Sequence, residues 1–250
     1  MNPQELTGSV AIVTGAGRNI GRAIALELAA AGAAVVVNAR SHHEETQAVV
    51  RDIIAQGGRA LPFLADVADI RAVERMVAAA TQHFGRIDIL VNNAALRVER
   101  PFQDMTQSDW HSVLAVILDG AFNCTKAALS QLRASGVGAV VNIGGLSAHT
   151  GAQNRAHVVT AKAGLVGLTR ALAHDLAADN VTVNCVAPGL IETARKPGLP
   201  EPAHHRIHHP LRGRHGAPDD IAGAVRFLCG PGARYISGQT IHVNGGAFLS

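Results

Sequence analysis

Aromatic residues are scarce in this chain. They make up 3% of its 250 residues, and only one is a tyrosine, Tyr235. Hydrophobic residues still account for 48% of the sequence, so the core must consist mainly of alanine, valine, leucine and isoleucine. Strands that are buried on both faces of a parallel sheet are almost continuously aliphatic. The composition therefore favours a parallel sheet that is flanked by helices.

Cysteine is also rare. The three cysteines, Cys124, Cys185 and Cys229, lie far apart in apolar segments. No pair has the spacing of metal ligands, and the odd number does not suggest a disulfide framework. We therefore expect buried free thiols, with no disulfide and no metal site.

The sequence lacks a strong excess of charge and a long apolar run. The net charge is +3, with lysine and arginine scattered, whereas a nucleic-acid surface gathers basic residues on one face. The N-terminus does not resemble a signal peptide, and the apolar runs are shorter than the ~18 residues that a membrane span needs. We predict a soluble, cytoplasmic protein that binds neither nucleic acid nor a membrane.

Short aliphatic runs alternate with amphipathic segments along the whole chain. We expect strands at 9–14, 34–38, 60–65, 87–92, 139–143, 181–187 and 240–243. We expect helices at about 20–31, 43–56, 70–84, 108–135, 157–178 and 218–229. This alternation predicts a doubly wound parallel sheet of about seven strands with helices on both faces. No repeat or linker interrupts it, so residues 1–250 are predicted to form one α/β domain.

The segment 189–217 breaks this rhythm. It contains four prolines and the run HHRIHH at 204–209, and it is too long for an ordinary connection. The histidines could bind a metal, but the run itself contains no carboxylate or cysteine partner. We therefore favour a substrate loop.

A glycine-rich turn follows the first expected strand, in the stretch TGAGRNIG. Gly15, Gly17 and Gly21 stand between that strand and an alanine-rich helix. Glycines in this position let backbone amides approach a pyrophosphate at the helix N-terminus. The context therefore predicts a Rossmann-type dinucleotide site.

Five motifs in order resemble those of the short-chain dehydrogenase/reductase family, in particular its 3-oxoacyl-ACP-reductase-like members. They are the glycine turn at 14–21, Asp66-Val67, Asn92-Asn93-Ala94-Ala95, Pro188-Gly189 with Thr193, and the stretch SGQTIHVNGG at 237–246. Asn19 stands where that family usually has a glycine. The resemblance spans the whole chain and implies cofactor contacts from Gly15, Gly17, Arg18, Asn19, Ile20, Gly21, Arg40, Asp66, Val67, Asn92, Ala94, Lys162, Pro188, Gly189, Ile191 and Thr193.

The second expected strand ends without a carboxylate. An NAD site usually places an acidic residue there to bond the ribose, but this chain has Ala39 and Arg40. Arg40, together with Arg18, could hold a 2′-phosphate. The sequence therefore favours NADP(H), with NAD(H) as the alternative.

The resemblance also shows which catalytic residues this sequence lacks. Members of the family use a tyrosine, a lysine four residues later, a serine and an asparagine to stabilise and protonate the developing alkoxide. Aligned on Lys162, the tyrosine place holds Val158, the serine place Gly145 and the asparagine place Ile117. Only the lysine remains.

Nearby residues could substitute. Ser147 offers a hydroxyl, and His149 and His157 offer side chains that titrate near pH 7, while Thr160 lies between Val158 and Lys162. We select Lys162, His157 and Ser147 as catalytic candidates. Plain structural roles remain open for all three, and Lys162 could simply bond the cofactor ribose.

Two main hypotheses follow. The first is an oxidoreductase with an unusual proton donor, or with a substrate such as an iminium that needs none. The second is a catalytically silent subunit or cofactor sensor that assembles with an active relative. A redox-neutral reaction with a histidine base is a weaker third. The family resemblance implies a homodimer or homotetramer, or a hetero-oligomer under the second hypothesis.

Overall fold

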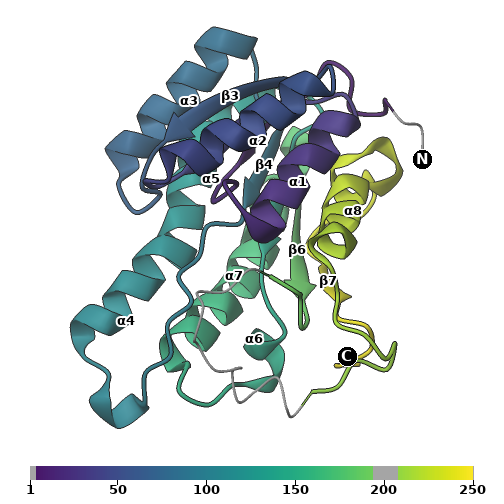
Figure 1. Ribbon diagram of the computed structural model, residues 1–250. Helices are drawn as coiled ribbons and strands as arrows, with labels where there is room; N and C mark the ends of the chain where they lie inside the picture. The colour runs from purple at the N-terminus through teal and green to yellow at the C-terminus, as the bar shows by residue number, and fades with distance from the viewer. Residues whose placement is uncertain (1–3, 194–207, 250) are drawn as a thin grey trace.

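The computed structural model describes residues 4–193 and 208–249, and in them a seven-stranded parallel sheet forms the centre of the molecule (Figure 1). The strand order is β3-β2-β1-β4-β5-β6-β7. The strands are β1 (Val10–Val13), β2 (Ala34–Ala39), β3 (Arg59–Leu64), β4 (Ile89–Asn92), β5 (Ala139–Ile143), β6 (Thr182–Pro188) and β7 (Thr240–Val243). The predicted fold class and all seven predicted strands are confirmed.

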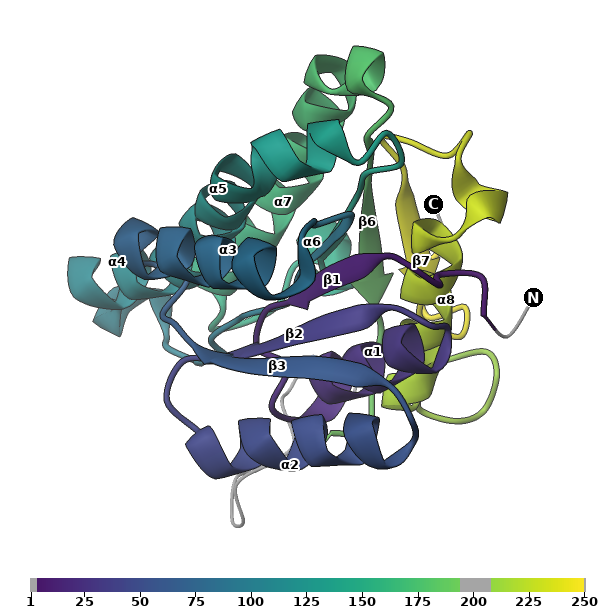
Figure 2. The same cartoon turned by 90° about the horizontal axis from the view of Figure 1, so that it is seen from above.

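Helices cover both faces of the sheet (Figure 2). The longer helices are α1 (Asn19–Ala30), α2 (His43–Ala55), α3 (Ile70–Phe84), α4 (Gln107–Leu114), α5 (Gly120–Ala134), α7 (Ala156–Asp175) and α8 (Pro218–Cys229). Short helical turns are η1 (Phe102–Asp104), η2 (Ala115–Asp119), α6 (Ser147–Thr150), η3 (Ala177–Asp179) and η5 (Pro231–Ala233). The helix predicted over 108–135 is α4 and α5, joined by the single π-helical turn η2.

The core is divided into two layers by the pleat of the strands. Ala11 and Val13 of β1 face a cluster formed with α1, α2 and α8. Ile12, between them, faces a second cluster formed with α3 and α5. Successive side chains of a strand point to opposite faces, so an unbroken aliphatic run fills both layers at once.

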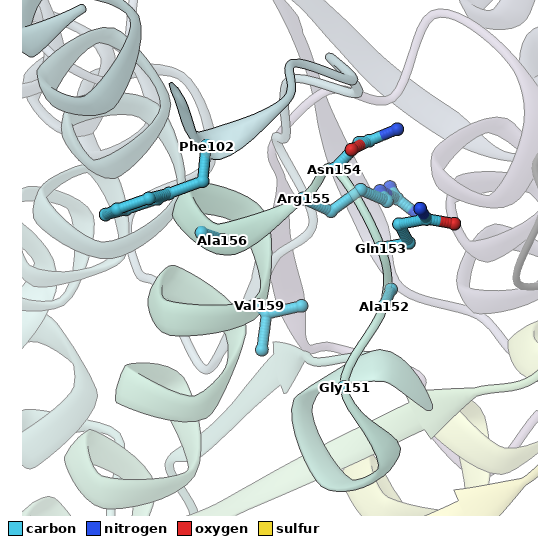
Figure 3. A pocket seen from close by; sticks show the side chains of 8 residues that line it. All are labelled: Phe102, Gly151, Ala152, Gln153, Asn154, Arg155, Ala156 and Val159. Carbon is cyan, nitrogen blue, oxygen red and sulfur yellow. The ribbon is translucent and has the colours of Figure 1, made fainter. Parts of the chain in front are cut away.

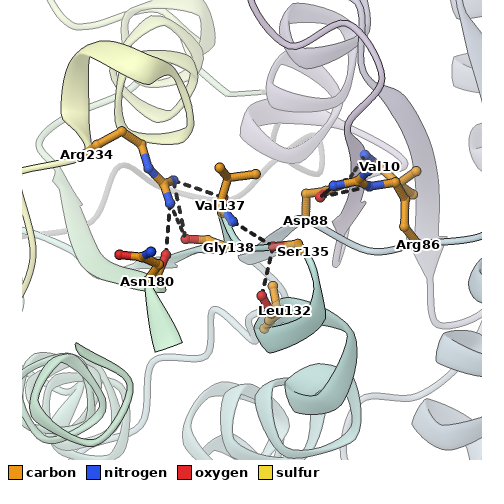
Figure 4. Close-up of polar contacts among 9 residues, drawn as sticks. All are labelled: Val10, Arg86, Asp88, Leu132, Ser135, Val137, Gly138, Asn180 and Arg234. Carbon is orange, nitrogen blue, oxygen red and sulfur yellow. Dashed lines mark hydrogen bonds and ion pairs between the residues drawn. The ribbon is translucent and has the colours of Figure 1, made fainter. Parts of the chain in front are cut away.

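The amino ends of the central strands are fastened by charged side chains (Figure 4). The buried carboxylate of Asp88, just before β4, accepts hydrogen bonds from the amide of Val10 (2.9 Å) and from Arg86 (Nε, 3.0 Å). Arg234 donates to the carbonyl oxygens of Val137 and Asn180, both at 2.9 Å. These contacts occupy the amino ends of the strands. The carboxyl ends are therefore where we look for a ligand site.

The strand order reverses between β1 and β4. From β1 the chain moves to β2 and β3 on one side, and it then returns to β4 on the other. In open parallel sheets the crevice at such a point, outside the carboxyl ends of the strands, is the usual ligand site.

One helix tests the prediction that no segment spans a membrane. Within the described residues, the continuous helical segment Gln107–Ala134, made of α4, η2 and α5, is 28 residues long and contains an 18-residue window with a mean hydropathy of 1.3, enough by length and composition alone to cross a bilayer. Core helices of soluble proteins pass the same test, and α5 packs Cys124 and Leu132 into the layer beside α3. The absence of a membrane span stays a prediction.

Candidate functional site

The glycine turn lies at the carboxyl end of β1, and two of its glycines are required by close backbone contacts. Gly15 has φ +62°, and a Cβ there would lie 3.0 Å from the Cα of Ala94. A Cβ on Gly21 would lie 2.3 Å from the carbonyl oxygen of Gly15. Real Cβ atoms do not occupy a distance such as that at Gly21, and at Gly15 the left-handed φ disfavours other residues. These two glycines therefore keep the first turn of α1 against the loop that follows β4.

Side-chain hydrogen bonds hold the same turn from β4. The side-chain nitrogen Nδ2 of Asn93 donates to the backbone carbonyl oxygens of Thr14 (2.8 Å) and Gly15 (3.0 Å). The Thr14 hydroxyl accepts from the backbone amides of Asn93 and Ala94, both at 3.0 Å. The turn is therefore built without any ligand.

The other residues of the turn differ in backbone conformation and burial. Gly17 has no backbone strain, and its Cβ would make only ordinary contacts, the nearest at 3.5 Å. Asn19 has φ 51°, in the left-handed region that asparagine tolerates better than most residues. This explains how Asn19 can stand where the family usually has glycine. Arg18 gives α1 no side-chain cap, while Ile20 is buried in the core.

Arg18 and Arg40 are both exposed near this turn, as the NADP(H) prediction requires. Within the described residues, neither guanidinium forms an ion pair or a side-chain hydrogen bond. No carboxylate follows β2 before α2. A phosphate that binds either cation would therefore displace no partner among the described residues.

Asn38 was missed by the sequence analysis. It is buried at the end of β2, its side-chain nitrogen donates to the carbonyl oxygens of Phe63 (3.2 Å) and Ala65 (3.1 Å), and its own carbonyl accepts from Ala16 (2.7 Å). It ties the glycine turn to β2 and β3. A polar residue inside an aliphatic strand was the signal that could have revealed it.

Three other residues that the family resemblance implies as cofactor contacts, Asp66, Val67 and Asn92, make different hydrogen bonds in the structure. Asp66 accepts from the amide of Ala68 at 3.0 Å, and the carbonyl of the buried Val67 accepts from Asn123 at 2.9 Å. Asn92 is turned inward, where it donates to the side chains of Asn142 (2.9 Å) and Thr125 (3.3 Å). Asn92 therefore links β4 to β5 and α5, and its side chain stabilises the sheet behind the crevice.

The loop after β6 contributes the last group of predicted residues. A Cβ on Gly189, next to Pro188, would lie 2.7 Å from the Cα of Asn244. Ile191 pairs with Gly216 in an isolated bridge, and the Thr193 hydroxyl accepts from Nη1 of Arg97 at 3.1 Å. The described residues thus fit a dinucleotide, because the glycine-lined N-terminus of α1 and the exposed Arg18 and Arg40 all follow the carboxyl ends of β1 and β2.

The three positions that the sequence analysis aligned with the family's tyrosine, asparagine and serine have no polar side chain in this structure. Val158 and Ile117 are 3% and 2% exposed and belong to one buried cluster, with Leu165 among its other members. Gly145 is different, since a Cβ there would meet nothing within 4 Å. Two of the positions are therefore filled by packed side chains, and the third is open.

Lys162 is the titratable group at the centre of this region. It lies on the same face of α7 as Val158, four residues away, and its ammonium group donates to the carbonyl oxygen of Ile143 at the end of β5. The pKa of Lys162 is lowered to about 8, chiefly because the ammonium group is buried; Cys185 acts in the opposite direction, and the charges of Arg97 and Arg155 contribute to the lowering. A lysine with such a pKa is a workable acid near neutral pH.

The other two catalytic candidates do not join Lys162. His157 is 0% exposed, contrary to the simple expectation of a water-facing residue at a helix N-terminus. Its Nδ1 accepts from the amide of Val158 at 3.0 Å, and burial lowers its pKa. Ser147, the first residue of α6, is partly buried, and its hydroxyl makes no hydrogen bond within the described residues. Neither residue is placed as a partner of Lys162.

His149 belongs to a ring cluster that the sequence did not reveal. Its ring centroid lies 4.5 Å from that of His242 and 5.7 Å from that of Phe248. Burial lowers the pKa of both histidines. The described residues contain no group of three or more His, Cys, Asp or Glu that could hold a metal, and His204 to Ile207 of the histidine run lie outside the described part of the chain.

A hollow of about 430 Å³ opens beside the start of α7 (Figure 3). Phe102 and Val159 give it apolar walls, while the polar ends of Gln153, Asn154 and Arg155 lie on the other side. Its remaining lining residues are Gly151, Ala152 and Ala156. The sequence analysis did not single out these positions.

Comparison with known proteins gives consistent matches. A family model described as enoyl-(acyl carrier protein) reductase matches residues 15–247. The 3-oxoacyl-[acyl-carrier-protein] reductase of Synechocystis sp. is 42% identical over 246 residues, 98% of each chain, and a Staphylococcus aureus protein of that name is 39% identical over 241 residues, 96% of this chain and 98% of the relative. Among solved structures, a dehydrogenase/reductase from Sinorhizobium meliloti superposes with a TM-score of 0.92 at 34% identity, covering 99% of this chain and 98% of the other. A short-chain dehydrogenase from Burkholderia cenocepacia in complex with NADP gives a TM-score of 0.89 at 36% identity, covering 97% and 99%.

Proposed function

The chain belongs to the short-chain dehydrogenase/reductase family, and we propose that it is an NADP(H)-binding oxidoreductase that reduces a C=O or C=N bond with Lys162 as the proton donor. The single observation that carries this proposal is the state of Lys162. It is a buried amine at the end of β5 with a pKa of about 8, beside positions where Val158, Ile117 and Gly145 have no side-chain proton to give.

The glycine turn and the exposed arginines would hold the cofactor. Backbone amides at the start of α1 suit the pyrophosphate, and Arg18 and Arg40 suit a 2′-phosphate. A structurally similar relative in complex with NADP supports this choice. When bound, the nicotinamide supplies a hydride to the substrate carbon.

Reduction of a carbonyl also needs a proton at oxygen. The Lys162 ammonium can donate that proton and stabilise the developing negative charge, since a desolvated cation interacts strongly with an alkoxide. Its hydrogen bond to Ile143 holds the amine at the end of β5, next to the open position at Gly145. An iminium substrate would need the residue less, because it already carries positive charge.

A second candidate is a catalytically silent, cofactor-binding subunit. The observation that favours it is the packing of Val158 and Ile117, which are sealed in an apolar cluster with Leu165. In the family these two positions hold the tyrosine and the asparagine that take part in proton transfer. Packed apolar side chains are expected there if the protein no longer catalyses the reaction. Such a subunit would assemble with an active relative, whereas the first candidate needs only copies of itself. A homodimer or homotetramer and a cytoplasmic location remain predictions.

The test is turnover of NADPH with a panel of ketones, cyclic imines and enoyl thioesters. We expect oxidation of NADPH with a ketone or imine, and a loss of kcat of about 100-fold or more in Lys162→Met, because general acid catalysis contributes about 10²–10⁴. Lys126→Met, a change at an exposed lysine of α5, is the matched control and should retain activity.

The two candidates give different results in that assay. Tight NADPH binding with no turnover of any substrate, together with a copurifying dehydrogenase, would favour the silent subunit. Turnover by a homogeneous homo-oligomer would exclude it. Turnover that survives in Lys162→Met would remove Lys162 as the proton donor.

A further inference from the structure

Two successive glycines follow β5 at its carboxyl end, and their surroundings differ. A Cβ on Gly144 would lie 2.7 Å from the sulfur of the buried Cys185 on β6, so packing requires glycine there. A Cβ on Gly145 would meet nothing within 4 Å, and its φ lies outside the left-handed region. Neither packing nor backbone strain therefore requires glycine at position 145, and the missing side chain leaves an open space.

The backbone that borders this space is held on both sides. Gly145 is itself partly buried and stands between two buried residues, Gly144 and Leu146. The amide of Gly144 donates to the carbonyl oxygen of Val186, and the amide of Leu146 donates to that of Pro188, both at 2.8 Å. The space is therefore a recess between fixed segments of β5 and β6, which we call the Gly145 recess.

The Gly145 recess lies beside the proposed proton donor. The ammonium group of Lys162 donates to the carbonyl oxygen of Ile143, two residues before Gly145. Val158, one turn before Lys162 on α7, and Leu146, next to Gly145, are buried and apolar. An apolar group is stabilised by burial in such surroundings, whereas a polar group without a partner is destabilised. A substrate whose oxygen or nitrogen reaches Lys162 would bring a substituent of its reacting carbon to this recess.

We propose that Gly145 determines substrate specificity, because the Gly145 recess receives a large apolar group attached directly to the reacting carbon. This inference rests on the proposed reduction of a C=O or C=N bond and names its substrate class, aryl or branched ketones and imines. Any side chain at position 145 would occupy the space that this group fills. One methylene group in an apolar pocket changes kcat/KM by about 10- to 200-fold, so the size of residue 145 should discriminate strongly between substrates.

The kinetic test compares two ketones that contain the same phenyl ring. Acetophenone carries the ring on the reacting carbon, and 4-phenylbutan-2-one separates it from that carbon by two methylene groups. We expect Gly145→Val to lower kcat/KM about 100-fold for acetophenone and less than about threefold for 4-phenylbutan-2-one, with a loss of about tenfold for acetophenone in the smaller variant Gly145→Ala.

The matched control is Gly223→Val in α8. A Cβ on Gly223 also meets nothing within 4 Å, and this glycine is also partly buried. The control should leave kcat/KM for both ketones unchanged. Urea denaturation of each variant identifies any loss that comes from unfolding, and Gly145→Ala decides the question if Gly145→Val does not fold. Equal losses for the two ketones in a folded variant, or no loss for either, would overturn the inference and leave the proposed reductase standing.

A binding test separates this inference from the proposed reduction. The tertiary alcohols 2-phenylpropan-2-ol and 2-methyl-4-phenylbutan-2-ol carry the groups of the two ketones, and neither can take part in hydride transfer. In NMR titrations of the NADP-loaded protein, Gly145→Val should weaken binding of the first alcohol about tenfold or more and leave binding of the second unchanged. That result without turnover of any ketone or imine would support the recess and contradict the reductase. Equal effects on the two alcohols would contradict the recess directly.

Discussion

On the side of β1 and β4 the crevice is shaped by backbone, and on the side of β5 and α7 it is shaped by side chains. A Cβ on Gly21 would meet the carbonyl oxygen of Gly15 at 2.3 Å, whereas a Cβ on Gly145 would meet nothing within 4 Å. A position whose Cβ would contact backbone atoms at such a distance can hold only glycine, and this requirement does not depend on the reaction that the protein catalyses. Side chains such as Val158 and Ile117 can replace polar groups while the fold stays packed. We therefore predict that substitutions on the two sides affect nucleotide binding and proton transfer separately.

The largest expected effect is on the backbone side. Gly21→Ala should weaken NADPH binding about 100-fold and lower the free energy of unfolding by about 1–3 kcal/mol, because the turn must open to admit the methyl group. Fluorescence titration and chemical denaturation measure the two quantities. The control is Gly223→Ala in α8, where a Cβ meets nothing within 4 Å, and it should gain about 0.5–1 kcal/mol of stability with unchanged binding. Equal effects of the two variants would contradict the comparison.

A smaller effect is expected at Arg40. Arg40→Ala should weaken NADPH binding about 10- to 100-fold and leave NADH binding unchanged, since a hydrogen bond to a charged group contributes about 1.5–3 kcal/mol. Competitive titration of the two cofactors measures this difference. Tighter binding of NADH than of NADPH by the unmodified protein would show that the arginines do not select a phosphate.

On the side-chain side, the pH profile reports on Lys162. Its pKa in the free protein is about 8, and a general acid must be protonated, so kcat/KM should be level below that pH and fall about tenfold per unit above it. Lys162→Arg, whose charge persists to far higher pH, should lose that limb along with part of the activity. A limb near pH 8 that persists in Lys162→Arg belongs to another group.

The smallest change in activity is expected when hydroxyl groups are introduced at Gly145 and Val158. Gly145→Ser should change stability by less than about 0.5 kcal/mol, because its Cβ meets open space. Val158→Tyr should cost about 1–3 kcal/mol, because it overfills a packed cluster. The double variant should gain ketone reduction only in part, since Ile117 remains. Full recovery would show that the apolar cluster imposes no constraint on proton transfer.

Much of the fold and the position of the glycine turn could be predicted from local pattern. Aliphatic runs and helical periodicity located every strand, and the glycine turn located the crevice, because both depend on neighbours in the sequence. The hydrogen bonds of Asn38, the burial of His157 and the hollow beside Phe102 could not be predicted. They depend on segments that are distant along the chain.

The sequence by itself determined the alternation of strands and helices, the need for glycine at the turn, and the absence of tyrosine, serine and asparagine from the expected places. Only the tertiary structure decided that Lys162 is buried, that Arg97 reaches Thr193 across the end of β5, and that Ser147 and His157 stand apart from them. The physical reason is that a residue type fixes which groups are present, whereas desolvation and electrostatic interaction depend on distances that arise only when remote segments pack together.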